Sequence, residues 1–397
     1  MNSSTTEEAK APLVFSNKNK LDIVMVPITI SCILISFDIF MLMYDLLLFH
    51  LSIRGIDCQG YVHINNKPSN LIFITFYVKI YKVMLWNELE KPFLILAPME
   101  GVTDVIFRQV VARAGRPDVF FTEFTNVSSY ASEKGRANAL ERLEISDSDR
   151  PIVAQIWGKN PEHFKETCSA LKELGFSGVD LNFGCPDKHV NKAGGGAAMI
   201  KTPELAVECF RNAVSATSLP VSIKTRLGWA NIDENQNWLS TLLNEHPVAL
   251  TVHLRTKKEM SKVAAHYELI PAILKLRNEI SPETKLIING DIKDRADALK
   301  LHEKYPEIDG FMIGRGVFQN PYCFTDHTPT REELMDLLNY HLDLYEQKSK
   351  TTYLSYEPLK HFFKMYINNF PGASELRAKL METHNVKEAR DILAHLG

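Results

Sequence analysis

Cys185 is the residue whose type and setting most directly suggest acid–base or nucleophilic chemistry. It lies in Asn182-Phe-Gly-Cys-Pro186, where Gly184 and Pro186 predict a tight turn directly after an apolar run. A lone cysteine is more often a small buried hydrophobic residue, and no metal-ligand spacing surrounds this one. A thiol with a pKa of about 8.5 is mostly protonated at neutral pH and can donate a proton. A nucleophilic thiolate needs an activating histidine, for which His253 is the candidate.

Polar and charged residues follow each of eight apolar runs. In chain order they are Pro98-Met99-Glu100, Glu123, Gln155, Asn182 with Cys185, Lys224 with Arg226, His253 with Arg255, Asn289-Gly290-Asp291, and Gly314-Arg315-Gly316. Lys224 can stabilise the anionic charge of a reduced flavin, and Gln155 offers a donor and an acceptor to its imide edge. Each residue has a simpler interpretation as well. Glu123 and Asp291 in particular could cap helices or close ion pairs.

Two glycine-rich segments invite a phosphate-binding interpretation. Gly314-Arg315-Gly316 can bring backbone N–H groups and a guanidinium to a phosphate, although an ordinary turn is the alternative. Gly194-Gly195-Gly196 does not fit a nucleotide loop, because Ile200 precedes Lys201 where a P-loop needs glycine. The pattern G-x-G-x-x-G also fails, at Met199. We interpret this second segment as a turn in a loop over the site.

The eight apolar runs alternate with segments of helical period, and this pattern predicts a (β/α)₈ barrel over residues 84–325. The runs are residues 93–99, 119–124, 152–157, 178–184, 221–227, 249–255, 285–291 and 310–316. Helical period is clearest in 161–174, 203–216 and 294–305. A doubly wound sheet would require a dinucleotide fingerprint after an early strand, and the sequence has none. The polar residues would then meet at the carboxyl ends of the barrel strands.

A small all-helical domain is predicted over residues 329–397. Five residues share one face of its first helix: Leu334, Leu337, Leu338, His341 and Tyr345. Further helices are expected at 357–368, 374–383 and 386–396, with prolines between them.

The first 83 residues have a different, apolar character. The stretch 23–53 is long enough to span a bilayer, but it contains Asp38 and Asp45, each of which costs roughly 2.5–3.5 kcal/mol on insertion. No small-residue cleavage site follows, as a signal peptide would need. Met84 opens a natural lead into a folded enzyme, so we favour an upstream extension of the reading frame that is not translated. No membrane association is expected, and a native peptide from residues 1–83 would contradict this view.

Composition restricts the class of protein and its compartment. Hydrophobic residues make up 45% and charged residues 23%, which is typical of a folded protein. The net charge is -3, from 45 Lys+Arg and 48 Asp+Glu, so any nucleic acid must be held by a local patch. The six cysteines include no C-x-x-C pair, which excludes a disulfide framework and a cysteine zinc site. A cytoplasmic location and no metal site are therefore expected.

Seven motifs, in this order, resemble those of the tRNA-dihydrouridine synthases. They are Leu96-Ala-Pro-Met-Glu-Gly-Val-Thr-Asp104, Gln155-Ile-Trp-Gly158, Asp180-Leu-Asn-Phe-Gly-Cys-Pro186, Lys224-Thr-Arg-Leu-Gly228, His253-Leu-Arg-Thr256, Asn289-Gly-Asp291 and Gly314-Arg-Gly316. The resemblance extends over about residues 88–397. It implies an FMN-dependent barrel enzyme that uses NADPH to reduce particular uridines of tRNA to 5,6-dihydrouridine, with the helical tail as the tRNA-binding domain.

The resemblance also implies roles for individual residues. FMN would be held by Pro98, Met99, Glu100, Gln155, Lys224, His253, Asn289, Gly290, Asp291, Gly314 and Arg315. The substrate would be contacted by Asn182, Arg226, Lys360 and Lys364. Cys185 would donate the proton to uracil C5 after a hydride from flavin N5 has reached C6. The target base must be flipped into the barrel mouth. A monomer without a stable protein partner is expected.

The sequence departs from the family pattern in two places. Leu254 replaces a glycine of the sixth-strand motif, and the loop that follows has Ser261, Val263 and Ala265-His266-Tyr267 where the family usually has other residues. These changes affect substrate contacts more than FMN. In the tail, Lys360 and Lys364 are four residues apart and are predicted to share a helical face, which could be only a solvated surface.

Two other functions fit the same residues. One is an FMN barrel that reduces a free small molecule such as a pyrimidine base. The other is a tRNA-binding or membrane-tethered scaffold that has kept the barrel without catalysis. Intact Cys185, Lys224 and His253 argue against a scaffold. A requirement for the helical tail would favour tRNA over a small molecule.

Overall fold

The computed structural model describes residues 24–32, 57–66, 72–81 and 85–395. The chain divides into two compact units, Met1–Met84 and Leu85–Gly397. In the first unit, β1 (Val24–Cys32) and β2 (Asp57–Asn66) both pair antiparallel with the central strand β3 (Ile72–Tyr81). Most of the apolar stretch 23–53, for which an anchor was considered, lies outside the described residues. Within the described ranges, no helix is long and apolar enough to cross a membrane.

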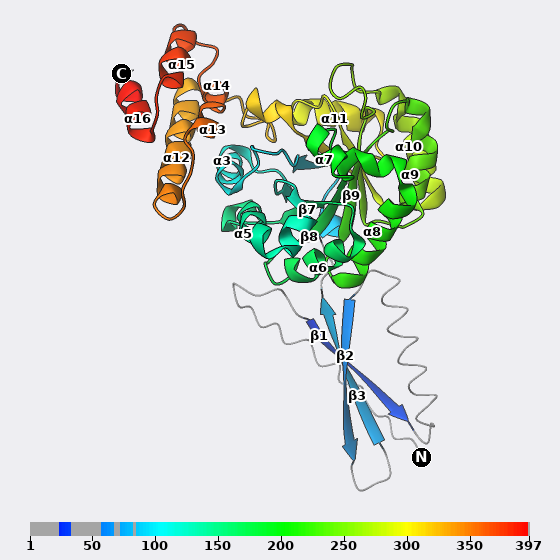
Figure 1. Ribbon diagram of the computed structural model, residues 1–397. Helices are drawn as coiled ribbons and strands as arrows, with labels where there is room; N and C mark the ends of the chain where they lie inside the picture. Colours follow the sequence, from blue (N-terminus) through cyan, green and yellow to red (C-terminus); the bar gives the residue numbers. More distant parts are fainter. Residues whose placement is uncertain (1–23, 33–56, 67–71, 82–84, 396–397) are drawn as a thin grey trace, which may run out of the picture. The chain divides into compact units, whose positions relative to one another are not determined.

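A closed (β/α)₈ barrel forms the larger part of the second unit, which confirms the predicted fold (Figure 1). Its strands are β4 (Phe93–Leu96), β5 (Phe120–Phe121), β6 (Thr125–Asn126), β7 (Ile152–Trp157), β8 (Gly178–Phe183), β9 (Val221–Arg226), β10 (Ala249–His253), β11 (Lys285–Asn289) and β12 (Gly310–Ile313). The second predicted strand is divided into β5 and β6, which both pair with β7. β12 pairs with β4 in parallel, and the Leu96 N–H donates to the Val119 carbonyl at 3.2 Å. These contacts close the barrel.

Helices follow the strands in the order that the sequence predicts. They are α3 (Val105–Gly115), α4 (Val127–Ala131), α5 (Glu133–Arg142), α6 (Pro161–Leu171), α7 (Lys188–Lys192), α8 (Pro203–Ala216), α9 (Asn235–Leu243), α10 (Ile270–Ile280) and α11 (Arg295–Lys304). Side-chain caps fix their starts: Asp104 accepts from the Phe107 N–H, and Asp294 from the Asp297 N–H. Each cap therefore fixes the residue at which the loop at the barrel mouth ends and the helix begins.

Alternation along the strands separates two apolar cores. In β4, Phe93 and Ile95 belong to a cluster inside the barrel, whereas Leu94 and Leu96 pack with the surrounding helices. Trp86, in the short helix α2 (Leu85–Glu88), joins the inner cluster, with its ring centroid 5.9 Å from that of Phe93. Because Phe93 opens its strand, α2 covers the amino-terminal end of the barrel. The opposite end is left to polar residues.

The carboxyl-terminal region is helical, as predicted. It contains α12 (Arg331–Ser349), α13 (Glu357–Lys360), α14 (Phe363–Tyr366), α15 (Ala373–Met381) and α16 (Val386–Ala394). All five residues predicted for one face of the first helix are buried in α12. The helices gather beside α3 in Figure 1. Phe362 stacks on Phe107 of α3 with ring centroids 4.9 Å apart, so one apolar core continues from the barrel into the helices.

The prediction of a single helix over residues 357–368 is wrong. Two helices of four residues stand there, separated by His361 and Phe362. Phe362, at this interruption, is buried and stacks on the rings of Phe107 and Phe318. Lys360 is buried and Lys364 is exposed, so the two do not form one exposed face.

Candidate active site

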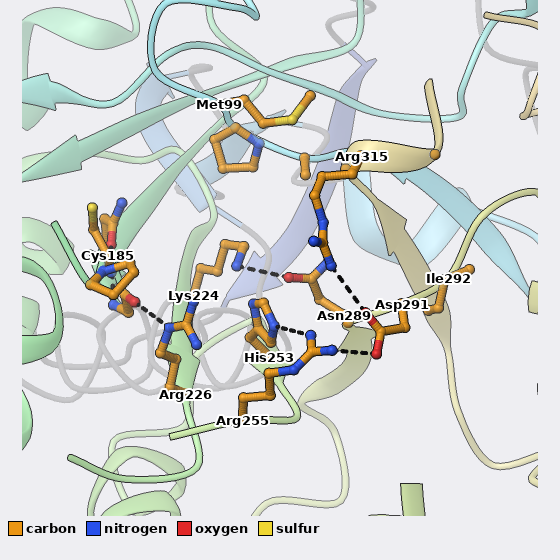
Figure 2. A pocket seen from close by; sticks show the side chains of 18 of the residues that line it. Met99, Cys185, Lys224, Arg226, His253, Arg255, Asn289, Asp291, Ile292 and Arg315 are labelled. Atoms are coloured by element: carbon orange, nitrogen blue, oxygen red, sulfur yellow. Dashed lines mark hydrogen bonds and ion pairs between the residues drawn. The ribbon is translucent and has the colours of Figure 1, made fainter. Parts of the chain in front are cut away.

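A cavity of about 500 Å³ opens at the carboxyl ends of the barrel strands (Figure 2). Thirteen of the residues predicted for the site line it: Pro98, Met99, Gln155, Asn182, Cys185, Lys224, Arg226, His253, Asn289, Gly290, Asp291, Gly314 and Arg315. Strand register brings them together, because Asn182 pairs with Lys224 and His253 pairs with both Arg226 and Asn289. The equivalent ends of parallel strands therefore form one polar layer above the apolar interior.

A chain of buried hydrogen bonds runs beneath the cavity towards Cys185. Asp180 accepts from the Ser222 hydroxyl at 2.7 Å and from Gln155 Nε2 at 2.7 Å. Gln155 Oε1 in turn accepts from Asn182 Nδ2 at 2.9 Å. Burial raises the pKa of Asp180 to about 6. These bonds fix the Gln155 amide with its nitrogen towards Asp180 and its oxygen towards Asn182.

Cys185 is half-buried on a loop that is tied down at its backbone. Its N–H donates to Asn182 Oδ1 at 2.9 Å, and its carbonyl accepts from Asn191 Nδ2 at 2.9 Å and from the Ala197 N–H at 3.0 Å. Burial raises the pKa of the Cys185 thiol above its ordinary value. The sulfur is therefore a protonated thiol at neutral pH, held at the edge of the cavity.

The three glycines after α7 are explained by packing around this cysteine. Gly194 and Gly196 have φ values of 87° and 59°, which favour glycine. A Cβ at Gly195 would lie 2.7 Å from the Trp157 ring, and one at Gly196 would lie 2.8 Å from the Cys185 carbonyl oxygen. The segment is a tight turn against the Cys185 loop, in agreement with the rejection of a nucleotide loop.

Two cations of β9 reach the floor and wall of the cavity. Lys224 Nζ donates to Asn289 Oδ1 at 3.2 Å, and burial together with the neighbouring Arg226 lowers the lysine pKa to about 8. Arg226 donates to the Gly184 carbonyl at 2.8 Å and to the Thr256 and Met260 carbonyls at 3.1 and 3.0 Å. Arg226 thus fastens the Cys185 loop and the loop after β10 to β9.

A second charged group lies across the cavity, at the ends of β10, β11 and β12. Arg255 Nη1 lies 3.1 Å from His253 Nε2, and Arg255 forms an ion pair with Asp291, which also pairs with Arg315 at 3.1 Å (Figure 2). Asp291 has a positive φ of 55°. Burial and then the charges of Arg226, Lys224, Arg255 and Arg315 hold the pKa of His253 well below its ordinary value. His253 is therefore neutral.

Two glycines follow β12 and differ in their surroundings. A Cβ on Gly314 would meet Ala97 and Met99 at 3.5 and 3.7 Å, so it would occupy cavity space without a clash. At Gly316 a Cβ would lie 1.9 Å from the Lys293 carbonyl oxygen, so only glycine fits there. Beside them stands Arg315, whose side chain is 65% exposed. Backbone N–H groups and a guanidinium thus meet at one edge of the cavity.

Three predicted site residues do not line this cavity. Glu100 pairs with Arg142 at 2.6 Å and lines a second cavity of about 570 Å³ together with Phe124, Trp157 and His189. Lys360 is buried and pairs with Glu357 at 2.8 Å, while Lys364 is exposed on α14. The buried, paired ammonium of Lys360 is poorly placed for a phosphate contact.

The cavity also contains residues that sequence reasoning did not assign to the site. The main ones are Phe124, Arg255 and Lys293. Arg255 was noted at its strand end, and its spacing of two from His253 is the signal that both face the same side of a strand. Phe124 and Lys293 carry no such signal, because both lie in loops. The part of the chain that the structure describes has no cluster of three or more metal-ligating side chains.

Comparison with known proteins places this geometry in a family. The family model "Dihydrouridine synthase (Dus)" matches residues 95–396. "Probable tRNA-dihydrouridine synthase 2" of Bacillus subtilis (strain 168) is 50% identical over 310 residues, which are 78% of this chain and 95% of that protein. "Probable tRNA-dihydrouridine synthase" of Staphylococcus aureus (strain COL) is 50% identical over 314 residues, 79% of this chain and 95% of that protein. The chain belongs to the dihydrouridine synthase family.

Proposed function

We propose that this protein reduces uridines of tRNA to 5,6-dihydrouridine, with FMN as cofactor and NADPH as reductant. The observation that carries the proposal is the position of Cys185, whose backbone is held by Asn182 at the edge of a cavity that the cationic side chains of Lys224 and Arg315 also line. This arrangement joins a proton donor to a binding site for an anionic cofactor. The named relatives support tRNA as the substrate.

The residues of the cavity fit FMN. The Gly314-Arg315-Gly316 segment offers a phosphate the backbone N–H groups of a glycine turn and a guanidinium. Lys224, whose pKa of about 8 leaves it mostly charged at neutral pH, lies within the barrel mouth and can stabilise negative charge on a reduced ring system. His253 and Asn289 supply neutral polar groups next to it. These residues would hold the cofactor, and the buried Gln155–Asp180 pair would support its ring edge.

The chemistry needs one hydride and one proton across the C5=C6 bond of uracil. When bound in this cavity, FMN would supply the hydride for C6, with NADPH as its reductant. Cys185 donates its proton to C5, where negative charge develops, and becomes a thiolate that solvent reprotonates. Asn182 accepts from the Cys185 N–H and lines the cavity, so it would hold in place the loop that carries the thiol. Met99, which also lines the cavity, would provide an apolar contact.

A tRNA substrate must reach the cavity through the loops that follow the strands. Several lysines of these loops form no ion pair with any described residue: Lys159, Lys188, Lys192, Lys201, Lys257, Lys258 and Lys262. Lys201 and Lys257 both lie over the Trp229 ring, at 3.9 and 4.5 Å from its centroid. We infer that this rim binds RNA phosphates, with the helical region 329–397 as a further tRNA contact. A monomer in the cytoplasm would suit this activity.

Mapping of dihydrouridine in tRNA from a strain that lacks the protein tests the proposed function. Loss of the modified base at defined positions, restored by the wild-type gene, is the expected result. Purified protein should also be yellow and should bleach with NADPH under anaerobic conditions. Unchanged dihydrouridine at every position, in a strain without a second enzyme of this family, would contradict the proposal.

A further inference from the structure

Arg255 is the buried residue of the site that the proposed chemistry does not use. Its side chain is 2% exposed and makes three hydrogen-bonding contacts. Nε donates to the Val263 carbonyl at 2.6 Å, Nη2 pairs with Asp291, and Nη1 lies 3.1 Å from His253 Nε2. The guanidinium therefore connects the ends of β10 and β11 to the loop after β10. Figure 2 shows it between His253 and Asp291.

The contact with His253 fixes the position of a proton. A guanidinium has five N–H donors and no acceptor, so it can only donate to the imidazole. His253 Nε2 must then be the unprotonated nitrogen, and a neutral ring carries its proton on Nδ1. Among the described residues, Nδ1 has no hydrogen-bond partner and is not a buried orphan atom. Since His253 lines the cavity, Nδ1–H is available to a ligand there.

We propose that Arg255 is a positioning residue that holds His253 as the neutral Nδ1–H tautomer, so that the histidine offers the cavity a hydrogen-bond donor without a positive charge. The surroundings fit this role. Lys224 and Arg226 face the ring from β9, Arg315 from the end of β12, and Asn289 is its strand partner on β11. A protonated His253 would add another cation to this group. Only the identity of the acceptor, FMN, rests on the proposed function.

The backbone around Arg255 is built to keep it in place. Asp291, which orients the guanidinium, also accepts from the Ala265 N–H at 3.0 Å. Gly290, with φ of 120°, allows the ring to approach, because a Cβ there would lie 3.4 Å from His253 Cδ2 and 3.2 Å from Ala265 Cβ. Tyr267 donates to the Gly290 carbonyl at 2.6 Å. The loop that departs from the family pattern is thus tied to the Arg255 contacts.

Nitrogen NMR of the full-length holoenzyme with ¹⁵N-labelled histidine tests the proposal. The His253 signal, one of 13 histidines, is identified by its absence in His253→Asn. Wild-type protein at neutral pH should show the pattern of a neutral ring with Nδ1 protonated. An Nε2–H pattern, or an imidazolium, in the wild type would overturn the proposal without any further variant.

Arg255→Met tests whether Arg255 determines the tautomer of His253. Its His253 signal should shift to the Nε2–H tautomer or to exchange between the two, and FMN should bind roughly three- to tenfold more weakly, as expected for one lost hydrogen bond. Arg277→Met is the matched control, because Arg277 is also buried and paired, with Asp309 at 3.1 Å, at the other end of the barrel. It should leave the His253 signal and FMN affinity unchanged.

Failure of this inference and failure of the proposed function give different results. If Arg255→Met does not fold, Arg255→Lys keeps the charge but cannot donate to His253, Asp291 and Val263 together, and should show both tautomers. A His253 signal identical to wild type in whichever variant folds would refute the role of Arg255. Absence of dihydrouridine synthesis together with the expected spectra would instead refute the proposed function and leave this inference standing.

Discussion

At the scale of single residues, the chemistry of the site depends on the protonation states of Cys185, Lys224 and His253. The pKa of the Cys185 thiol is raised by burial, that of Lys224 is lowered to about 8, and His253 is neutral. Burial is the main cause of all three shifts, and neighbouring cations lower the pKa values of Lys224 and His253 further. The Cys185 thiol is thus a neutral acid, Lys224 is a cation that can titrate, and His253 is a neutral hydrogen-bond donor.

Cys185→Ala should separate the two halves of the reaction. The variant keeps the cavity and should bind FMN and accept electrons from NADPH at the wild-type rate. Formation of dihydrouridine should fall by roughly 10²–10⁴-fold, the usual contribution of a general acid. Stopped-flow flavin spectra and product analysis measure the two steps. Cys168→Ala, at a buried thiol in α6, is the control, and wild-type activity in Cys185→Ala would remove the cysteine from the mechanism.

Lys224 should make FMN affinity depend on pH. Because its pKa is lowered to about 8, the free enzyme loses this positive charge as the pH rises through that value. Binding of an anionic cofactor should therefore be strong below pH 8 and weaken above it. Fluorescence titration of FMN between neutral and alkaline pH measures the change, and Lys224→Met should bind weakly with a flatter profile. A wild-type profile as flat as that of the variant would exclude this role.

At the scale of elements, the loops at the strand ends bring backbone groups close to the cavity, which the strands themselves do not. The strands place side chains in register, but Gly194-Gly195-Gly196 and Gly314-Arg315-Gly316 bring backbone close to a side chain or a ligand. Caps such as Asp104 and Asp294 then start the next helix at once. After β11, for example, only a few residues separate the strand end at Asn289 from the cap at Asp294.

The two glycines after β12 should respond differently to alanine. Gly316→Ala places a Cβ 1.9 Å from the Lys293 carbonyl and should cost about 1–3 kcal/mol of stability, as overpacking does. Gly314→Ala meets only ordinary contacts, so it should leave the melting temperature nearly unchanged while it weakens FMN binding by filling the cavity. Thermal unfolding and FMN titration of both variants measure the contrast. Equal melting temperatures would contradict the packing argument.

At the scale of the whole molecule, the barrel and the carboxyl-terminal helices share a core. Phe107 and Phe318 of the barrel unit stack on Phe362, and Lys348 pairs with Glu144. Deletion of residues 331–397 would expose this apolar surface, so loss of activity in such a truncation would not identify an RNA contact. Surface substitutions are the better test of tRNA binding.

Loss of charge at the rim should weaken tRNA binding in a salt-dependent way. The double variant Lys201→Gln, Lys257→Gln removes two unpaired cations over Trp229. The slope of log affinity against log salt should become shallower by about one unit for each lysine. Filter binding of unmodified tRNA at several salt concentrations measures it. Lys304→Gln is matched, since Lys304 also lies over an aromatic ring, Tyr305, at 5.1 Å, and should have no effect. An unchanged slope in the double variant would exclude the rim.

The sequence by itself determined the barrel, the helical tail and the residues at the strand ends. This succeeded because strand periodicity and parallel topology together dictate where side chains meet. It also placed Cys185 on a tight turn at the end of a strand, since the glycine and proline beside it are local features, and the proposal that its thiol is the acid builds on that placement. The family motifs then implied further residues of the cavity, although not Arg255 or Lys293.

Only the tertiary structure decided which of these residues act together. Glu100 follows Met99 directly, yet it turns to Arg142 and a different cavity. Lys360 and Lys364 have helical spacing, but the helix is interrupted between them, where Phe362 packs on Phe107, and only Lys364 is exposed. Arg255 gained its position from contacts 8 and 36 residues away in the chain. Such outcomes depend on long-range packing and on charges from separate strands, which no local pattern in the sequence contains.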